Sequence, residues 1–469
     1  MSIETPEAQL PPGASAPTAS RRLHRRVARA IGLDRAIGYT VVGRVLQALG
    51  SVVNVLLILR FLSAPAQGYY YALWSLVALQ SVFELGFSFV ILQVAAHERI
   101  HLSFHPDGSV SGDAAARFRL ASILQRTVLW YGVASLVMGG ALLLGGIRFF
   151  SLHQQAAETT AWFGPLRITV LACMVIFTIG PILSFLEGCG QVTSVARIRF
   201  SQSLISTLAA WTAMISHHGL YAPAMVLFGQ SAVASIMLWS RRSLLLPLLR
   251  LRLRGRGISW MREVWPFQWK IAVSWLCDYF IFQLFTPVIF AFRGPAEAGR
   301  MGLSINIVTQ MGAMMLVWMT TKAAPFGSLI AKRENTALDA LFFRSLRQSL
   351  LLLVSGAIVV LAGVLVIPHF IPHLAHRIVS WPVFLLLLLT AIGGHVVQSE
   401  AIYLRAHKCE PFLLQSILIA VATAASVMFF ARTLGTLGVA VASFVVLGVC
   451  GTISATSIFF FKRKAWGYS

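Results

Sequence analysis

The stretch HERIH, residues 97–101, matches the pattern H-E-x-x-H of zinc metalloproteases. On a helix this spacing places two histidines on one face for zinc, with the glutamate as general base. A third ligand is not evident, because Asp278, the obvious intramembrane carboxylate, would lie about 15 Å deeper in the membrane. The sequence therefore predicts no metal site here, and a protease that uses His97, Glu98 and His101 remains a remote alternative.

Four charged residues lie deep within apolar stretches: Arg44, Glu84, Lys270 and Asp278. Such groups cost a few kcal/mol in a bilayer and usually face a partner or water. Arg44 and Lys270 hold nearly equivalent places in the first and seventh stretches, so we expect both to line a central cavity and bind an anionic substrate group. Glu84 differs from Arg44 in depth by only about 5 Å. Glu84 therefore pairs with Arg44 or lines the same wet cavity, a role that Asp278 could share.

Two further groups of polar residues give weaker evidence for a functional site. The segment PHFIPHLAHR has metal-like histidine spacing, but interfacial side chains explain it. A later apolar stretch carries His395, Gln398 and Glu400. We interpret His395 as a packing histidine with a hydrogen-bond partner, and a proton relay is the alternative.

The chain that must position these residues has the composition of a membrane protein. It has 469 residues, of which 57% are hydrophobic and 12% charged, whereas soluble domains have about 25% charged residues. Because the backbone must satisfy its own hydrogen bonds in lipid, we predict an all-α fold with twelve transmembrane helices. The predicted spans are 36–62, 69–96, 120–147, 162–186, 198–216, 221–240, 264–292, 299–321, 346–367, 382–406, 411–431 and 436–461.

The spans divide into two equal groups around a basic segment. We expect a disordered basic tail at 1–35, a six-helix bundle at 36–240, a linker at 241–263 and a second six-helix bundle at 264–469. The linker is polybasic, and we expect it to lie on lipid headgroups.

The two halves also share a sequence pattern. SAPAQGYYYALWSLVALQ in the first half aligns with RGPAEAGRMGLSINIVTQ in the second, so that Gly68 matches Gly299. Six spans per half give both halves the same orientation, which predicts a pseudo-two-fold axis along the membrane normal.

The formal net charge of +22 is not a sign of nucleic-acid binding. Lys and Arg gather in alternate loops, which is the positive-inside pattern, so both termini are predicted to be cytosolic and to face anionic membrane lipids. No soluble domain exists to carry nucleic acid. The sequence has no phosphate-binding loop of the G-x-x-x-x-G-K-[ST] type, and we expect no cofactor and no enzymatic activity.

The stretch LRFLSAPAQGYYYALWSLVALQSVFELGFSFVILQVAAHE resembles the first hairpin of the polysaccharide flippases. These belong to the multidrug/oligosaccharidyl-lipid/polysaccharide flippase superfamily. The shared features are a glycine followed by an aromatic residue (Gly68 and Tyr69), an acidic-Leu-Gly triplet (residues 84–86) and a glutamine near the inner end (Gln93). Many relatives carry Asp where this chain has Glu84.

This resemblance implies a V-shaped pair of six-helix bundles that works by alternating access in a bacterial inner membrane. The implied substrate is an undecaprenyl-pyrophosphate-linked oligosaccharide, flipped from the inner to the outer leaflet for lipopolysaccharide or exopolysaccharide synthesis. Polysaccharide polymerase and chain-length machinery are the implied partners. Arg44 and Lys270 would then form a cationic cavity floor for the pyrophosphate. An ion-coupled drug exporter of the same superfamily is the alternative.

Overall fold

The computed structural model describes residues 46, 50–105, 108–154, 160–252, 258–261, 265–370, 372, 376–407 and 411–466. The first half contains a helix at Gly50–Phe61, then α3 (Ala64–Ala78), α4 (Gln80–Glu84), α5 (Phe87–Arg99), β1 (Leu102–Phe104), β2 (Val110–Gly112), α6 (Ala114–His153), α7 (Phe163–Gly188), α8 (Val192–Ile215), η1 (Gly219–Tyr221), α9 (Ala222–Trp239) and α10 (Arg242–Arg250). The second half contains α11 (Trp265–Phe282), α12 (Phe285–Arg293), α13 (Pro295–Thr320), α14 (Ala323–Lys332), α15 (Asn335–Phe370), α17 (Trp381–Ala406), α18 (Leu413–Ser443), the π-helix η3 (Phe444–Gly451) and α19 (Thr452–Ala465).

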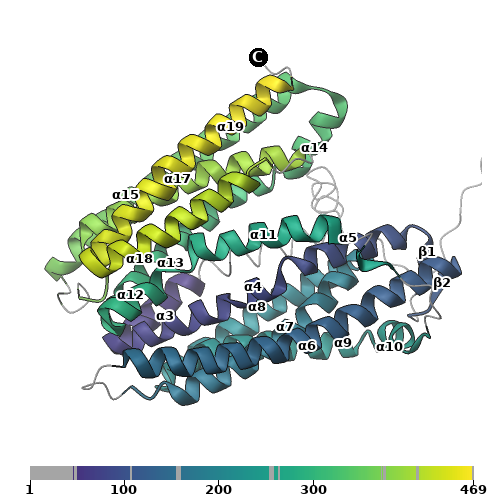
Figure 1. Ribbon diagram of the computed structural model, residues 1–469, viewed down its shortest axis with the longest axis horizontal. Coiled ribbons are helices and arrows are strands. Elements are labelled where there is room, and N and C mark those ends of the chain that lie inside the picture. Colours follow the sequence, from purple (N-terminus) through teal and green to yellow (C-terminus); the bar gives the residue numbers. More distant parts are fainter. Residues whose placement is uncertain are drawn as a thin grey trace, which may run out of the picture.

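These helices form two bundles in a V-shaped arrangement (Figure 1). The first bundle holds α3 to α9, and the second holds α13 to α19. They meet at one end, where α3 packs against α12 and α13, and they diverge towards the other end. We call these the closed end and the divergent end. The divergent end carries β1, β2, α10 and α14, and α11 lies between the bundles in contact with α4 and α18.

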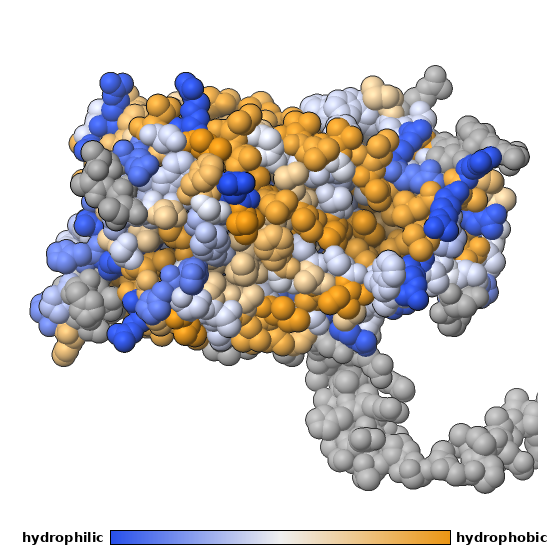
Figure 2. All heavy atoms as spheres, turned by 90° about the horizontal axis from the view of Figure 1, so that it is seen from below, coloured by the Kyte–Doolittle hydropathy of each residue, from blue (hydrophilic) through white to orange (hydrophobic). Residues whose placement is uncertain are grey.

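The described helices include seven segments that are long and apolar enough to cross a membrane, or up to nine if each of two bent pairs is one span. The chain is thus an all-α, multi-pass membrane protein. Figure 2 shows the corresponding surface, an apolar band between more hydrophilic ends. The bent pairs are Ala64–Glu84 with Phe87–Arg99 and Ile271–Phe282 with Phe285–Arg293, each bent by 43°.

Side chains that cap the first turn mark where some of these helices begin. The Ser63 hydroxyl caps α3 by accepting from the backbone N–H of Ala66 at 3.3 Å. The Asp113 carboxylate caps α6 by accepting from the N–H groups of Ala115 and Ala116. The backbone of Gly435, with φ 64°, is not helical, and it divides α18 into two consecutive helical parts.

The loop at the divergent end between α5 and α6 adds a small β-hairpin that the all-helical prediction did not include. Its strands are antiparallel, with Leu102 opposite Gly112 and Phe104 opposite Val110. Each strand has three residues, so the hairpin decorates the helical fold without changing its class.

Candidate functional site

The acidic-Leu-Gly triplet forms a break in the middle of a membrane segment. The sequence predicts one continuous span over 69–96, but α4 ends at Glu84 and α5 begins at Phe87. Between them Leu85 and Gly86 have left-handed backbones, with φ of 51° and 68°. A break of this kind frees backbone groups, which inside a membrane need partners from the protein.

Helix α11 of the second half supplies such a partner. Gln268 Nε2 donates a hydrogen bond to the freed carbonyl oxygen of Leu85 at 2.6 Å. A Cβ at Gly86 would lie 2.3 Å from Ile271 Cγ2 and 3.0 Å from Trp275 Nε1. Glycine is thus required both for the left-handed conformation and for the close approach of α11. The break is a contact between the two halves of the chain.

Glu84 stands at this contact and is half-buried. Its carboxyl group lies near the side chain of Ser88, one turn onward in α5. The Ser88 hydroxyl in turn lies 3.4 Å from the hydroxyl of Tyr131 in α6. Arg44, the predicted partner of Glu84, lies outside the described residues, so the proposed ion pair stays a prediction.

The other predicted cavity residues lie in α11. Lys270 falls within the helix, but its side chain is outside the described part of the chain. Asp278 is exposed. It follows Ile271 and Trp275 at helical spacing, so it continues the face of α11 that contacts the first half. Helical spacing therefore puts Asp278 on the face of α11 that carries Ile271 and Trp275, and its role in a cavity stays a prediction.

At the closed end a polar network joins the halves. Gln67 Nε2 donates to the carbonyl oxygen of Gly299 at 2.7 Å, and Arg377 Nε donates to Gln67 Oε1 at 2.9 Å. Arg377 also donates to the carbonyl oxygens of Ile58 and Leu62 at the end of the first helix. Gln67 is 1% exposed, so this network is shielded from water. Neither Gln67 nor Arg377 is identified by a sequence motif, although Gln67 directly precedes the repeat residue Gly68.

An aromatic cluster reinforces the same end. Phe290 of α12 lies edge-on to Tyr69 of α3, with ring centroids 5.1 Å apart. It also contacts Phe149 and Phe150 of α6, at 5.4 and 5.5 Å. The second half thus inserts an apolar anchor into the first, beside the Gln67–Arg377 network.

The HERIH stretch makes a different contact from the one a protease would need. Glu98 is 4% exposed, and its Oε1 accepts from Arg119 Nε at 2.8 Å. α5 ends at Arg99, and His101 lies in a turn beyond it. Glu98 therefore ties α5 to α6 at the base of the β-hairpin. The described residues hold no group of three or more metal-binding side chains; His373 of the other histidine-rich segment lies outside them.

The linker between the halves docks on the first bundle. The apolar face of α10 buries Leu244, Leu245 and Leu248 against the protein. Gln125 Nε2 of α6 donates to the carbonyl oxygens of Leu248 and Leu251, at 2.9 and 2.8 Å. Helix α10 therefore packs against α6, and the expected contact of the basic linker with lipid headgroups stays a prediction.

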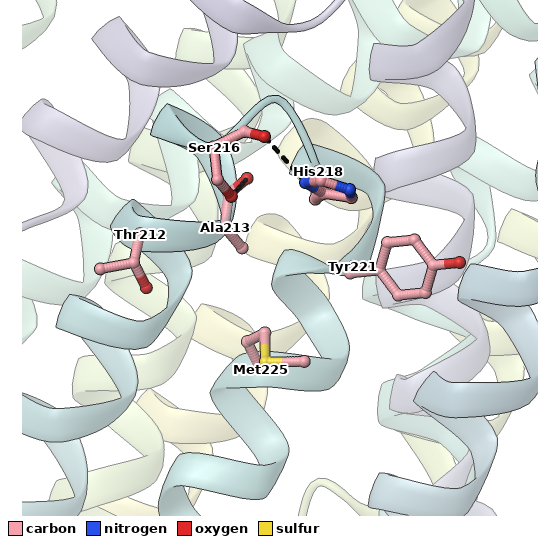
Figure 3. A pocket seen from close by; sticks show the side chains of 6 residues that line it. All are labelled: Thr212, Ala213, Ser216, His218, Tyr221 and Met225. Carbon is pink, nitrogen blue, oxygen red and sulfur yellow. Dashed lines mark hydrogen bonds between the residues drawn. The ribbon is translucent and has the colours of Figure 1, made fainter.

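A shallow pocket of about 390 Å³ lies at the turn between α8 and α9 (Figure 3). Its lining residues are Thr212, Ala213, Ser216, His218, Tyr221 and Met225. His218 Nδ1 bonds the Ser216 carbonyl oxygen at 2.7 Å, so the imidazole in the lining is held by its own turn. The pocket lies within the first half and is separate from the contacts between the bundles.

Similarly arranged chains occur among solved structures of membrane transporters. The lipid II flippase MurJ, in an inward closed conformation, aligns with a TM-score of 0.62 and 13% identity over 92% of this chain and 87% of its own. A multidrug resistance MATE transporter in an inward-facing conformation aligns at 0.59 and 12%, over 89% and 98%. A transporter from Pyrococcus furiosus, noted for the reverse polarity of its binding pocket, aligns at 0.56 and 14%, over 92% and 94%.

The chain has the fold of the MOP superfamily transporters. The MATE transporters and the Pyrococcus protein are described as members of that superfamily. The solved structures that share this arrangement are those of a multidrug resistance transporter and of a lipid flippase. No family model and no curated protein sequence matches the chain.

Proposed function

We propose that this protein flips an undecaprenyl-pyrophosphate-linked oligosaccharide from the inner to the outer leaflet of the cytoplasmic membrane, for surface polysaccharide synthesis. The observation that carries the proposal is the unequal closure of the two bundles. Gln67, Arg377 and Phe290 join them at one end, while the helices diverge at the other. A two-bundle carrier that is closed at one end can admit substrate at the open end. It can release the substrate when the closed end opens and the open end closes.

The orientation follows from charge. Described basic residues cluster at the divergent end, including Arg117, Arg199, Arg242, Lys332 and Lys464. The positive-inside rule supports a cytosolic divergent end, and the proposed orientation has both termini in the cytosol and the closed end at the outer face. A substrate made in the cytosol then meets the divergent side of the V.

The proposed architecture has twelve spans. The nine candidates include one long segment, Leu413–Ala465, that the backbone of Gly435 divides in two. α8 and the shorter apolar helix Gly50–Phe61, which belongs to the proposed first span, supply the other two. Six spans then fall on each side of the linker, as the sequence repeat requires.

The substrate class rests on the polysaccharide-flippase pattern of the first hairpin and on the proposed cationic floor. Arg44 and Lys270 would bind the pyrophosphate, which carries several negative charges. Glu84 and Asp278 would complete the polar lining near the broken spans. Pocket polarity bears on function in this fold, since the reverse polarity of its binding pocket suggests a different function for the Pyrococcus transporter. Polysaccharide polymerase and chain-length proteins are the proposed partners after release.

The proposal is tested by reconstitution. Purified protein is placed in liposomes with an undecaprenyl-pyrophosphate oligosaccharide that carries a fluorescent label, and a membrane-impermeant quencher added outside measures how much label reaches the outer leaflet of the liposome. We expect wild-type protein to expose all label to the quencher over time, and Arg44→Gln with Lys270→Gln to slow this strongly. An Arg242→Gln variant controls for loss of basic charge outside the proposed floor.

An ion-coupled drug exporter of the same fold is the second candidate, since MATE transporters share the arrangement. Cationic dyes in the same liposomes distinguish the two. Dye transport without movement of the labelled lipid would replace the flippase proposal with the exporter.

A further inference from the structure

Glu400 lies in the core of the second bundle, away from the contacts between the halves. It is 3% exposed and stands about one and a half turns before the end of α17 at Ala406. Its Oε1 accepts a hydrogen bond from Thr456 Oγ1 of α19 at 2.8 Å. Its Oε2 is buried and has no hydrogen-bond partner among the described residues.

No described cation neutralises this carboxylate. His395, on the same helix, bonds Ser349 of α15 at 2.9 Å. Arg463 of α19 bonds Asp339 of α15 at 2.6 Å. The other charged groups on the helices packed against α17 form no ion pair with Glu400; they are Glu297 and Arg300 of α13, Lys332 of α14, Arg344 and Arg347 of α15, Arg432 of α18, and Lys462 and Lys464 of α19.

A bare carboxylate in this position would be costly. Removal of a charge from water into an apolar interior is strongly unfavourable, and one neutral hydroxyl donor does not compensate for it. A neutral carboxylic acid avoids that cost, because only one oxygen then carries a proton and the other accepts from Thr456. The orphaned Oε2 is the oxygen that would carry the proton.

We propose that Glu400 is a proton-binding site of the second bundle, with the proton held on Oε2 in this conformation. Release breaks the O–H bond, gives the proton to water and leaves the carboxylate on Glu400. This step requires water to reach the site, so proton exchange is tied to a rearrangement of the α17–α19 interface.

The surroundings of Glu400 suit such a rearrangement. Thr452 lies one turn from Thr456 on α19, and its hydroxyl is also buried without a partner in the described structure. The π-helix η3 immediately precedes Thr452 and packs against α17. π-Helical turns strain the hydrogen-bond ladder and are frequent at functional sites. The proposal holds for any transported substrate, because it concerns a proton and not the region between the bundles.

Infrared spectroscopy of the purified full chain tests the proposal directly. A protonated carboxyl group has a carbonyl stretch that is separate from the amide bands, and the detergent is chosen to lack carbonyl groups. At neutral pH we expect a band that disappears in Glu400→Gln and persists in Glu334→Gln. Glu334 is an exposed glutamate of the second half and serves as the matched control.

A second variant keeps the test informative if Glu400→Gln does not fold. Thr456→Val removes the hydrogen bond to the carbonyl oxygen and should move the band to higher frequency while leaving its intensity. Absence of the band in wild-type protein at neutral pH would overturn the proposal. Loss of the band on addition of sodium ions at constant pH would also overturn it, in favour of a metal-cation site.

Discussion

Gly68 of α3 and Gly299 of α13 lie against each other across the boundary between the two bundles. A Cβ on Gly68 would lie 1.9 Å from the carbonyl oxygen of Pro295, and one on Gly299 would lie 2.8 Å from the backbone nitrogen of Gly68. The same two glycines occupy matching places in the repeated hairpin sequences. Residues related by a two-fold axis touch each other only close to that axis. The predicted pseudo-two-fold axis would therefore pass close to this contact.

Replacement of Gly68 by alanine should destabilise this contact. The obstacle is backbone, which cannot move aside as a flexible side chain can, so we expect a loss of about 1–3 kcal/mol. Thermal unfolding of the purified protein measures it. Gly145→Ala in α6 is the matched control, because nothing lies within 4 Å of its added Cβ and alanine favours the helix by about 0.5–1 kcal/mol. Equal unfolding temperatures for the two variants would show that the glycine contact is unimportant.

The Gln67–Arg377 network should hold the closed end shut. Arg377→Ala and Gln67→Ala should each speed the reaction of a cysteine at Ser304 with a membrane-impermeant maleimide, in protein whose native cysteines have been replaced. Ser304 is 0% exposed and accepts from the Val379 N–H, so its labelling reports opening.

Both substitutions break one network, so the double variant should label about as fast as either single variant. Arg300→Ala is the control for the Arg377 change. Its ion pair with Glu297 joins residues on one helix face and is partly exposed, and such pairs contribute less than about 1 kcal/mol. Unchanged labelling in Arg377→Ala would mean that the aromatic cluster alone keeps the end closed.

The membrane class could be predicted from the sequence because it depends on local composition. The equivalence of Gly68 and Gly299 was also visible, since both follow a proline by a few residues in similar hairpins. The partners of Gln67 could not be predicted. They are backbone carbonyls and an arginine more than 300 residues away, which only the packing of the two halves brings together.

The break at Leu85 illustrates the same limit. The triplet was visible as a motif, and its glycine permits a turn, but hydropathy indicated one continuous span. The hydrogen bond that stabilises the break comes from Gln268 in the other half, and residue type alone does not identify that donor. Glu400 was visible too, yet its lack of a cation partner emerged only from the positions of the surrounding helices.

The break itself can be tested by two substitutions. Gly86→Ala combines a left-handed backbone with a contact at 2.3 Å to Ile271, and Gln268→Ala leaves the Leu85 carbonyl without its donor. We expect each to cost about 1–3 kcal/mol and to slow transport. Gln398→Ala, at an exposed glutamine of α17, should change neither. Normal stability and transport in Gln268→Ala would show that the contact between α11 and the break is dispensable.

The end of α17 should respond to acid. His407 stacks on Trp466 with ring centroids 4.1 Å apart. Burial lowers the pKa of His407 below its ordinary value of about 6.5, and the nearby Asp339 carboxylate partly opposes this. Because the folded pKa is the lower one, stability from this contact is complete above the ordinary value and declines as pH falls towards the folded value.

Trp466 fluorescence follows this change, since a protonated imidazole quenches an adjacent indole. The difference between wild type and Trp466→Phe should decrease with acid at a pH below the range of free histidine, and His407→Gln should abolish the change. His105→Gln, at an exposed histidine of the β-hairpin, should leave it intact. A midpoint above the range of free histidine would show that the Asp339 charge outweighs burial.

The remaining prediction concerns Glu84 and Arg44. If Glu84 neutralises Arg44, Glu84→Gln leaves a positive charge uncompensated within the membrane, which costs about 3–5 kcal/mol in comparable buried pairs. The yield of folded protein should therefore fall in Glu84→Gln and recover in Glu84→Gln with Arg44→Gln. Transport should remain impaired in the double variant if Arg44 also binds the pyrophosphate. A double-mutant cycle scores inserted protein and flipped lipid separately. Strictly additive losses of yield would show that the two side chains do not meet. Full recovery of transport would show that Arg44 is structural and that the pyrophosphate binds elsewhere.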